Sequence, residues 1–514
     1  MHVFEIVIVL LLIGAALAAG ARRVGAPYPA LLALAGAALA LTPGVPAVML
    51  DPELALALFV APVLLDAAFD ASPRDLKENW RPVASLALGT VVLTVAAVAL
   101  TARWLVPELP WPAAIALGAI VAPPDAAAAT AVLRQLRPPH RLLVILEGES
   151  LFNDASALLI YRLAVGAAAA GAVSGWAIAP MLLGVTAGSI VLGLVLARAS
   201  LWVTARIQDV ATAVIVQFIG TFGVWIVAER LRLSGILTMV VYAMSVARTA
   251  PDILPARIRI PSYAVWEVAV FVLNVLAFIL VGLQLKPIVQ ELDRGELLRY
   301  TWIAAAVCGA VILVRVMWVM GANAVRGPGT PAARRHAIVV AWCGMRGTVT
   351  LAAALALPGG FPHRDLILFA SFLVVLGTLV LQGLTLKPLM ARLGIEHDDA
   401  VDREVRLARV EAIRAGAGTF DGSAARSEAA DLLRRKYQVR LQQAEARMGA
   451  GASAGPSPGE QTEYAAAARA ARAAERRRLS ALRTDGTIGD DAFHKVEEEL
   501  DRAELSAEAT HPED

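Results

Sequence analysis

The stretch from Glu149 to Tyr161 reads Glu-Ser-Leu-Phe-Asn-Asp-Ala-Ser-Ala-Leu-Leu-Ile-Tyr and places a Glu, a Ser, an Asn and an Asp inside a long apolar segment. On a helix, Ser150 and Asp154 are four residues apart and share a face, and Glu149 and Asn153 form a second pair one position round. Two neighbouring polar rows therefore point the same way. Because ionisable side chains at membrane depth are functional candidates by default, we predict that Asp154 carries a cation or a proton.

The chemistry open to Asp154 follows from its neighbours Ser150 and Asn153, which are neutral and bear oxygen atoms. Burial disfavours the bare carboxylate, so a proton or a cation should accompany it. Carboxylate, hydroxyl and carbonyl oxygens also suit hard cations such as Na⁺ or Li⁺. Competition between a proton and a cation for one carboxylate is the simplest route to exchange. The alternative is a protonated Asp154 that only links two helices by a hydrogen bond.

The composition indicates an all-α polytopic membrane protein, because 58% of the 514 residues are hydrophobic, only 18% are charged and the mean hydropathy is +0.64. Lys and Arg are concentrated in the loops after odd-numbered spans, which predicts an inner (plasma) membrane protein with its N-terminus outside and its C-terminal tail in the cytoplasm. We predict about thirteen spans of the length that a bilayer requires, at residues 2–20, 28–46, 54–71, 82–106, 112–135, 141–169, 174–205, 209–230, 233–248, 263–288, 299–322, 334–357 and 366–393.

Two of the predicted spans are interrupted near the middle of the membrane. The fifth contains Ala122-Pro-Pro-Asp125, whose prolines remove hydrogen-bond donors, and the twelfth contains Trp342-Cys-Gly-Met-Arg-Gly347. Broken backbone is tolerated in a membrane where it lines a cavity, and the ends of half-helices form ion sites. One interruption in each half of the chain predicts an inverted repeat with a site near the midplane, where Arg346 compensates a half-helix end or tunes the field.

Arg315 lies among apolar residues in another predicted span, and a guanidinium group does not lose its proton. An ionised side chain at the centre of a bilayer costs about 2.5–3.5 kcal/mol, so Arg315 needs a carboxylate partner. We predict Glu149, in a structural ion pair between two helices rather than as a direct ion ligand. Asp66, in the third predicted span, either faces the site or lies near a membrane interface without a role.

Other classes of site are not indicated. Cys308 and Cys343 fall in apolar segments and predict small buried side chains, not a disulfide. The sequence has no nucleotide-binding loop, metal-ligand spacing or nucleophile elbow. We therefore predict no enzyme, no cofactor and no nucleic-acid partner. A cation channel or uniporter using the same buried groups remains an alternative, and a membrane-embedded enzyme is a weaker one.

Charge becomes dense from Gly394 onwards. This change predicts a membrane domain over residues 1–393 and a cytoplasmic helical tail over residues 394–514. The tail contains a flexible Gly/Ala/Ser/Pro linker near 449–459, with further helices expected across 464–482 and 490–505. Two interpretations of the tail stay open: solvated helices without a function of their own, or a region that binds a regulatory ligand or partner.

The order of Pro124-Asp125, Gly148-Glu-Ser-Leu-Phe-Asn-Asp154, Arg315 and Gly344-Met-Arg-Gly347 resembles the sodium/proton exchanger branch of the monovalent cation:proton antiporters, in its bacterial electroneutral Asn-Asp form. The resemblance spans most of residues 1–393. It implies one-for-one exchange of Na⁺, or of K⁺ or Li⁺, for a proton by alternating access. It also implies a homodimer in the lipid bilayer, each protomer having an interface domain and a core domain with two crossing, partly unwound helices.

The resemblance also implies roles for single residues. Asp154 would be the shared carrier, with Ser150 and Asp66 as further ligands of the transported Na⁺. Asp125 and Arg346 would lie at the helix crossing, and Glu149 would pair with Arg315.

Two positions refine what the resemblance implies. Asn153 in place of a second acid leaves one titrating carboxylate. Pro124 stands where many relatives have Thr, which removes a hydroxyl often placed at the ion and leaves backbone carbonyls or water to fill in.

Overall fold

The computed structural model describes residues 2–24, 27–43, 52–133, 138–170, 175–290, 293–325, 331–395, 400–418 and 428–449, together with Glu475 and Arg477. The chain divides into two compact units, Met1–Asp398 and Asp399–Asp514. Every regular element in the described residues is helical. The all-α class predicted from the sequence is confirmed.

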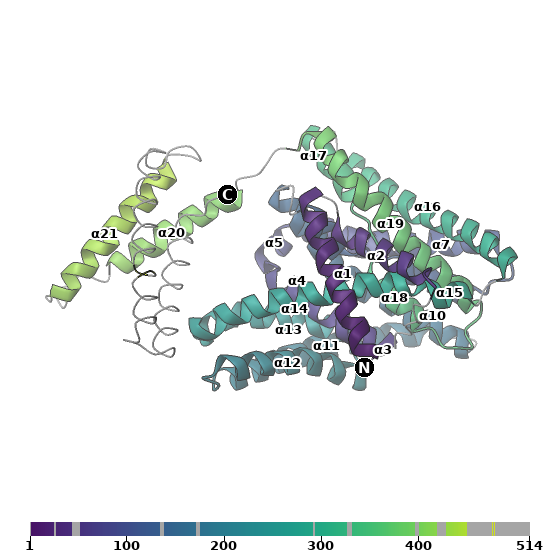
Figure 1. The fold of residues 1–514 in the computed structure, drawn as a ribbon, viewed down its shortest axis with the longest axis horizontal. Coiled ribbons are helices and arrows are strands. Elements are labelled where there is room, and N and C mark those ends of the chain that lie inside the picture. Colours follow the sequence, from purple (N-terminus) through teal and green to yellow (C-terminus); the bar gives the residue numbers. More distant parts are fainter. Residues whose placement is uncertain are drawn as a thin grey trace. The chain divides into compact units, whose positions relative to one another are not determined.

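The helices of the first unit overlap the predicted spans, except that α5 lies in the segment predicted to connect the third and fourth spans (Figure 1). In chain order they are α1 (His2–Val24), α2 (Tyr28–Ala40), α3 (Pro52–Ala55), the π-helix η1 (Leu56–Val60), α4 (Ala61–Asp70), α5 (Pro73–Glu78), α6 (Trp80–Ala84), the π-helix η2 (Ser85–Thr90), α7 (Val91–Leu105), α8 (Trp111–Val121), α9 (Ala126–Leu133), α10 (His140–Ala170), α11 (Gly175–Thr204), α12 (Val210–Arg230), α13 (Gly235–Ile253), α14 (Ala256–Leu283), α15 (Leu285–Gln290), α16 (Arg294–Val325), α17 (Pro331–Trp342), α18 (Thr348–Leu355) and α19 (Arg364–Leu393).

Length and hydropathy identify the helices best suited to cross a bilayer. Among the described residues, six helical stretches qualify: Trp80–Leu105, Leu183–Thr204, Val210–Arg230, Ala256–Gln290, Gly295–Ala324 and Arg364–Leu393. Shorter apolar helices cover Val7–Ala21, Tyr28–Ala40 and Trp111–Val121. The number of crossings therefore stays a prediction, as do the inverted repeat and the orientation of the termini.

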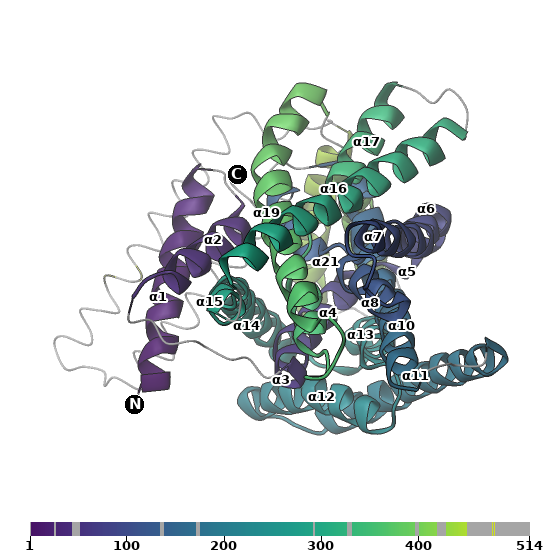
Figure 2. The ribbon, with the colours of Figure 1, turned by 90° about the vertical axis from the view of Figure 1, so that its right-hand side faces the viewer.

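Glycines allow α2 and α14 to pack side by side (Figure 2). A Cβ atom on Gly36 would overlap the carbonyl oxygen of Ile279, and one on Gly282 would overlap the carbonyl oxygen of Ala33. Lipid tails are as apolar as leucine, so membrane helices associate through close contact at such small residues. The absence of a side chain at these two glycines thus allows the backbones of α2 and α14 to come into direct contact.

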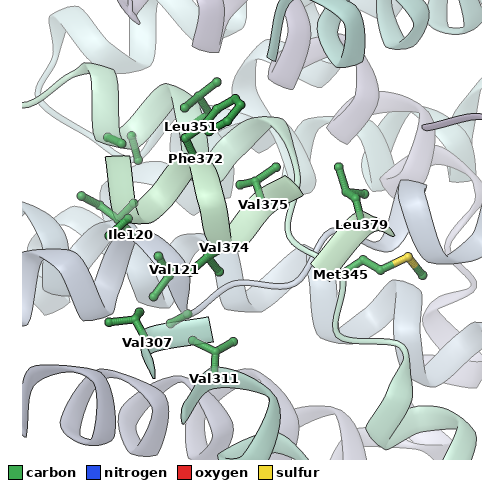
Figure 3. Packing of buried hydrophobic residues seen from close by; sticks show 14 of the residues in the cluster. Ile120, Val121, Val307, Val311, Met345, Leu351, Phe372, Val374, Val375 and Leu379 are labelled. Atoms are coloured by element: carbon green, nitrogen blue, oxygen red, sulfur yellow. The ribbon is translucent and has the colours of Figure 1, made fainter. Parts of the chain in front are cut away.

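A large apolar core surrounds the second interruption and joins α8, α16, α18 and α19. Figure 3 shows part of it, with the side chains of Ile120, Val121, Val307, Val311, Met345, Leu351, Phe372, Val374, Val375 and Leu379 in one cluster. A second cluster joins α4, α10, α11, α12 and α13. The functional residues described below lie on α10, on α4 and at the interrupted helices, so both clusters help to position them.

Both predicted interruptions are present. The helix α8 ends at Val121 and α9 begins at Ala126, while α17 ends at Trp342 and α18 begins at Thr348. Consecutive prolines cause the first break because they lack the N–H group and clash with the preceding turn. Each break leaves one half-helix C-terminus and one half-helix N-terminus inside the unit, and these ends need polar partners.

The second unit contains α20 (Ala400–Gly418) and α21 (Glu428–Gly449). These helices pack against each other, and Arg414 of α20 pairs with Glu445 of α21 at 2.7 Å. Their shared apolar face comprises Val410, Ile413, Tyr437, Leu441 and Ala444. The predicted linker and the two later helices lie almost wholly outside the described residues.

Candidate ion-binding site

The two interruptions meet. The backbone N–H of Asp125 donates to the carbonyl oxygen of Met345 at 2.7 Å. Gly347 lies so close to the same residue that a Cβ atom on it would overlap the Asp125 carboxylate. Asp125 directly precedes α9, and Gly347 directly precedes α18. Their contact therefore brings the starts of these two half-helices together at one carboxylate.

Asp125 accepts hydrogen bonds from both half-helix starts. Its Oδ1 atom accepts from the backbone N–H of Ala127 at 2.9 Å and of Ala128 at 3.3 Å in α9. The backbone N–H of Thr348 in α18 also donates to this carboxyl group. A helix N-terminus carries partial positive charge. One carboxylate therefore compensates two N-termini.

Arg346 makes the opposite interaction at the C-terminal ends. Its Nε atom donates to the carbonyl oxygen of Val121 at 2.8 Å, and Nη2 donates to that of Ala122 at 3.0 Å. The third nitrogen, Nη1, donates to the carbonyl oxygen of Gly344. The guanidinium is 1% exposed. It thus satisfies carbonyl groups that the interruptions leave without intrahelical donors.

Glu149 and Arg315 form a bidentate ion pair, with Nη1–Oε1 and Nη2–Oε2 distances of 2.5 and 2.8 Å. Both side chains are buried, at 1% and 0% exposure. Arg315 also donates to the carbonyl oxygen of Val340 from Nε and Nη2, at 3.2 and 3.1 Å. These bonds link α10, α16 and α17.

A cavity of about 1250 Å³ borders the place where the two interruptions meet, and its lining includes Asp154, Ser150, Asp125 and Asp66. Asp154 is buried, at 4% exposure. In the part of the chain that the structure describes, its carboxyl oxygens accept no hydrogen bond and pair with no Lys or Arg. Asp66 lies on α4 and is exposed to this space. The structure therefore brings these four predicted residues to one cavity.

Comparison with known proteins identifies the fold around this cavity. The family model described as "Sodium/hydrogen exchanger, transmembrane" matches residues 7–392. The chain belongs to the sodium/hydrogen exchanger family. It is accordingly a multi-pass membrane transporter that exchanges cations for protons.

Curated relatives match most of the chain of the exchanger. An uncharacterised Na⁺/H⁺ exchanger of Mycobacterium tuberculosis is 33% identical over 440 residues, which are 80% of this chain and 79% of that protein. The sodium, potassium, lithium and rubidium/H⁺ antiporter of Bacillus subtilis is 29% identical over 363 residues, 66% of this chain and 54% of that protein.

A solved structure supports the fold. The sodium proton antiporter MjNhaP1 from Methanocaldococcus jannaschii at pH 8 superposes with a TM-score of 0.61 at 19% identity, covering 77% of this chain and 99% of that one.

Asn153 takes a different place in the exchanger from Ser150 and Asp154 of the same helix. It is 0% exposed, is not part of the cavity lining, and neither atom of its amide group has a hydrogen-bond partner in the described residues. The cavity face of α10 instead follows Glu147, Ser150 and Asp154, spaced by three and four residues. Asn153 lies in the same row of α10 as Glu149, and this row is rotated by about 100° round the helix axis from the row of Ser150 and Asp154.

Several lining residues escaped the sequence analysis. Glu147 precedes Asp154 by seven residues, and Glu267 precedes Asn274 by seven on α14; all four line the cavity. A spacing of seven residues keeps side chains on one helix face. This spacing in the sequence could therefore have indicated that Glu147 and Glu267 face the same side of their helices as Asp154 and Asn274. Glu267 in particular interrupts an apolar run and could have been noted with the other acids.

Gly347→Ala should reduce exchange by about a hundredfold, because a misplacement of about 1 Å in the groups that shape a site can cost that much. The added methyl group would force Asp125 away from the start of α18. The matched control is Gly309→Ala on α16, where a Cβ atom meets nothing within 4 Å. Initial rates of proton flux, normalised to folded protein, measure the effect. Equal rates for the two variants would show that the close contact is dispensable.

Proposed function

We propose that the exchanger moves a monovalent cation, Na⁺ first and K⁺ or Li⁺ as further candidates, in one-for-one electroneutral exchange for a proton, with Asp154 as their shared carrier. The observation that carries this proposal is the position of Asp154: a buried carboxyl group in a cavity wall, without a hydrogen-bond donor among the described residues. A bare carboxylate is poorly solvated there, so a proton or a cation should accompany it.

The proposed stoichiometry treats Asp154 as the one carboxylate that exchanges its ion, because two other acids near the site are compensated within the protein. The charge of Glu149 is compensated by Arg315, and that of Asp125 by two half-helix starts. Asp125 therefore shapes the site rather than releasing an ion in each cycle. Ser150 and Asp66, in the same lining, serve as further ligands of the cation. One exchanging carboxylate then binds either one proton or one monovalent cation.

Alternating access supplies the transport step in this proposal. Asp154 is near neutral when it binds a proton or a cation, so either loaded form can cross with the moving part of the protein. The unloaded carboxylate carries a desolvation penalty and crosses rarely. This difference couples the two fluxes. The domain division at residues 393 and 394, the homodimer and a regulatory role for the tail belong to the same proposal.

Everted membrane vesicles containing the exchanger test the proposal. With an imposed proton gradient and a pH-sensitive dye, added Na⁺, K⁺ or Li⁺ should dissipate the gradient, whereas choline should not. Clamping the membrane potential with a K⁺ ionophore should leave the Na⁺-driven rate unchanged. A rate that follows the potential would contradict electroneutral exchange, and cation flux that ignores the proton gradient would contradict exchange itself.

A further inference from the structure

Thr350, near the start of α18, has a hydroxyl group without a protein partner. The residue is 1% exposed, and its Oγ1 atom has no hydrogen bond within the described residues. Thr350 also belongs to the lining of the cavity that contains Asp154. A buried hydroxyl group without a hydrogen bond is unfavourable. A site that retains one therefore has a place for another partner.

The interruption explains why this hydroxyl is unpaired. A Thr inside a helix commonly donates to the carbonyl oxygen four residues earlier, as Thr221 does to Gln217 at 2.9 Å. For Thr350 that residue is Arg346, which lies in the non-helical stretch before α18. The usual acceptor is therefore not aligned with the helix. The break thus leaves a residue of the cavity lining with a hydroxyl group that lacks its usual acceptor.

Thr350 differs in this respect from the other buried unpaired hydroxyls. Among the described residues these hydroxyls belong to Thr90, Thr94, Thr238 and Ser371, none of which lines the cavity. Within the described chain, Thr350 alone combines a buried unpaired hydroxyl with a place in the lining.

We propose that the Thr350 hydroxyl oxygen is a ligand of the transported cation and helps to set which cation is accepted; this inference rests on the exchange function proposed above. A hydroxyl oxygen has lone pairs that suit a hard cation, and it adds no charge to the site. The neighbouring interruption offers no such group at Pro124, which has neither a hydroxyl nor an N–H. Thr350 and Asp154 would then hold the cation from α18 and α10.

Thr350→Val tests the proposal because valine keeps the shape and removes the oxygen. The KM for Na⁺ should rise by about tenfold, equivalent to about 1.4 kcal/mol of lost binding, with little change in the maximal rate. Thr350→Ser keeps the hydroxyl and should keep a KM near the native value. The control is Thr238→Val, which removes another buried unpaired hydroxyl outside the cavity and should leave the KM unchanged.

A second readout is the Na⁺-dependent rise in melting temperature of the purified protein in detergent, which requires no transport. Thr350→Val should need about tenfold more Na⁺ for the same rise. An unchanged KM and an unchanged Na⁺ dependence of melting for Thr350→Val would overturn the proposal, as would an equal effect of Thr238→Val. If the native protein shows no cation-driven proton flux, the proposed function itself fails. Loss of the Thr350 effect alone leaves that function standing.

Discussion

Asp154→Asn should reduce cation-driven proton flux in everted vesicles to the level of vesicles without the exchanger. Asparagine has nearly the same shape as aspartate but neither titrates nor carries the charge that attracts a cation. Asp154 is buried and accepts no hydrogen bond among the described residues. The substitution therefore removes no hydrogen bond or ion pair that those residues make with the carboxylate. The protein should therefore fold normally and fail only in exchange.

The control for this variant makes the same chemical change elsewhere. Asp209→Asn alters the exposed residue whose Oδ2 atom accepts from the backbone N–H of Thr212 at 2.8 Å before α12. Asparagine caps helices about as well as aspartate, so exchange and melting temperature should both be retained. Appreciable cation-driven flux through folded Asp154→Asn protein would rule out Asp154 as the carrier.

Arg315→Ala should destabilise the folded exchanger by about 3–5 kcal/mol, because it leaves the buried Glu149 carboxylate unpaired. The loss extends to the Val340 carbonyl, which accepts two hydrogen bonds from the same guanidinium. Thermal melting in detergent and the yield of monodisperse protein measure the effect. Normal melting of Arg315→Ala would contradict a structural role for the pair.

The double variant Glu149→Met, Arg315→Met separates structure from transport. Replacing a whole buried ion pair by apolar side chains is often neutral for stability, whereas removing one partner is not. The double variant should thus melt at a higher temperature than Arg315→Ala and regain exchange. A double variant that folds well but transports nothing would show that Glu149 takes part in ion movement.

The sequence alone indicated the helical segments and their two interruptions, since apolar length, the consecutive prolines of the first interruption and the glycines of the second act locally. It also indicated the Glu149–Arg315 pair, because a guanidinium buried in a membrane needs a carboxylate partner and the family resemblance implied the same pair. Periodicity further grouped the polar residues of α10 into two rows. These properties depend on the residues themselves and on one helix at a time.

Only the tertiary structure decided which row of α10 meets the cavity. Helical spacing fixes the angle between Asn153 and Asp154 but not the direction in which either points relative to other helices. The same holds for Asp125 and Arg346, whose capping bonds join segments more than 200 residues apart. The free hydroxyl of Thr350 likewise depends on a cavity formed by helices distant in the chain. Such contacts arise from packing between helices, which local sequence patterns do not specify.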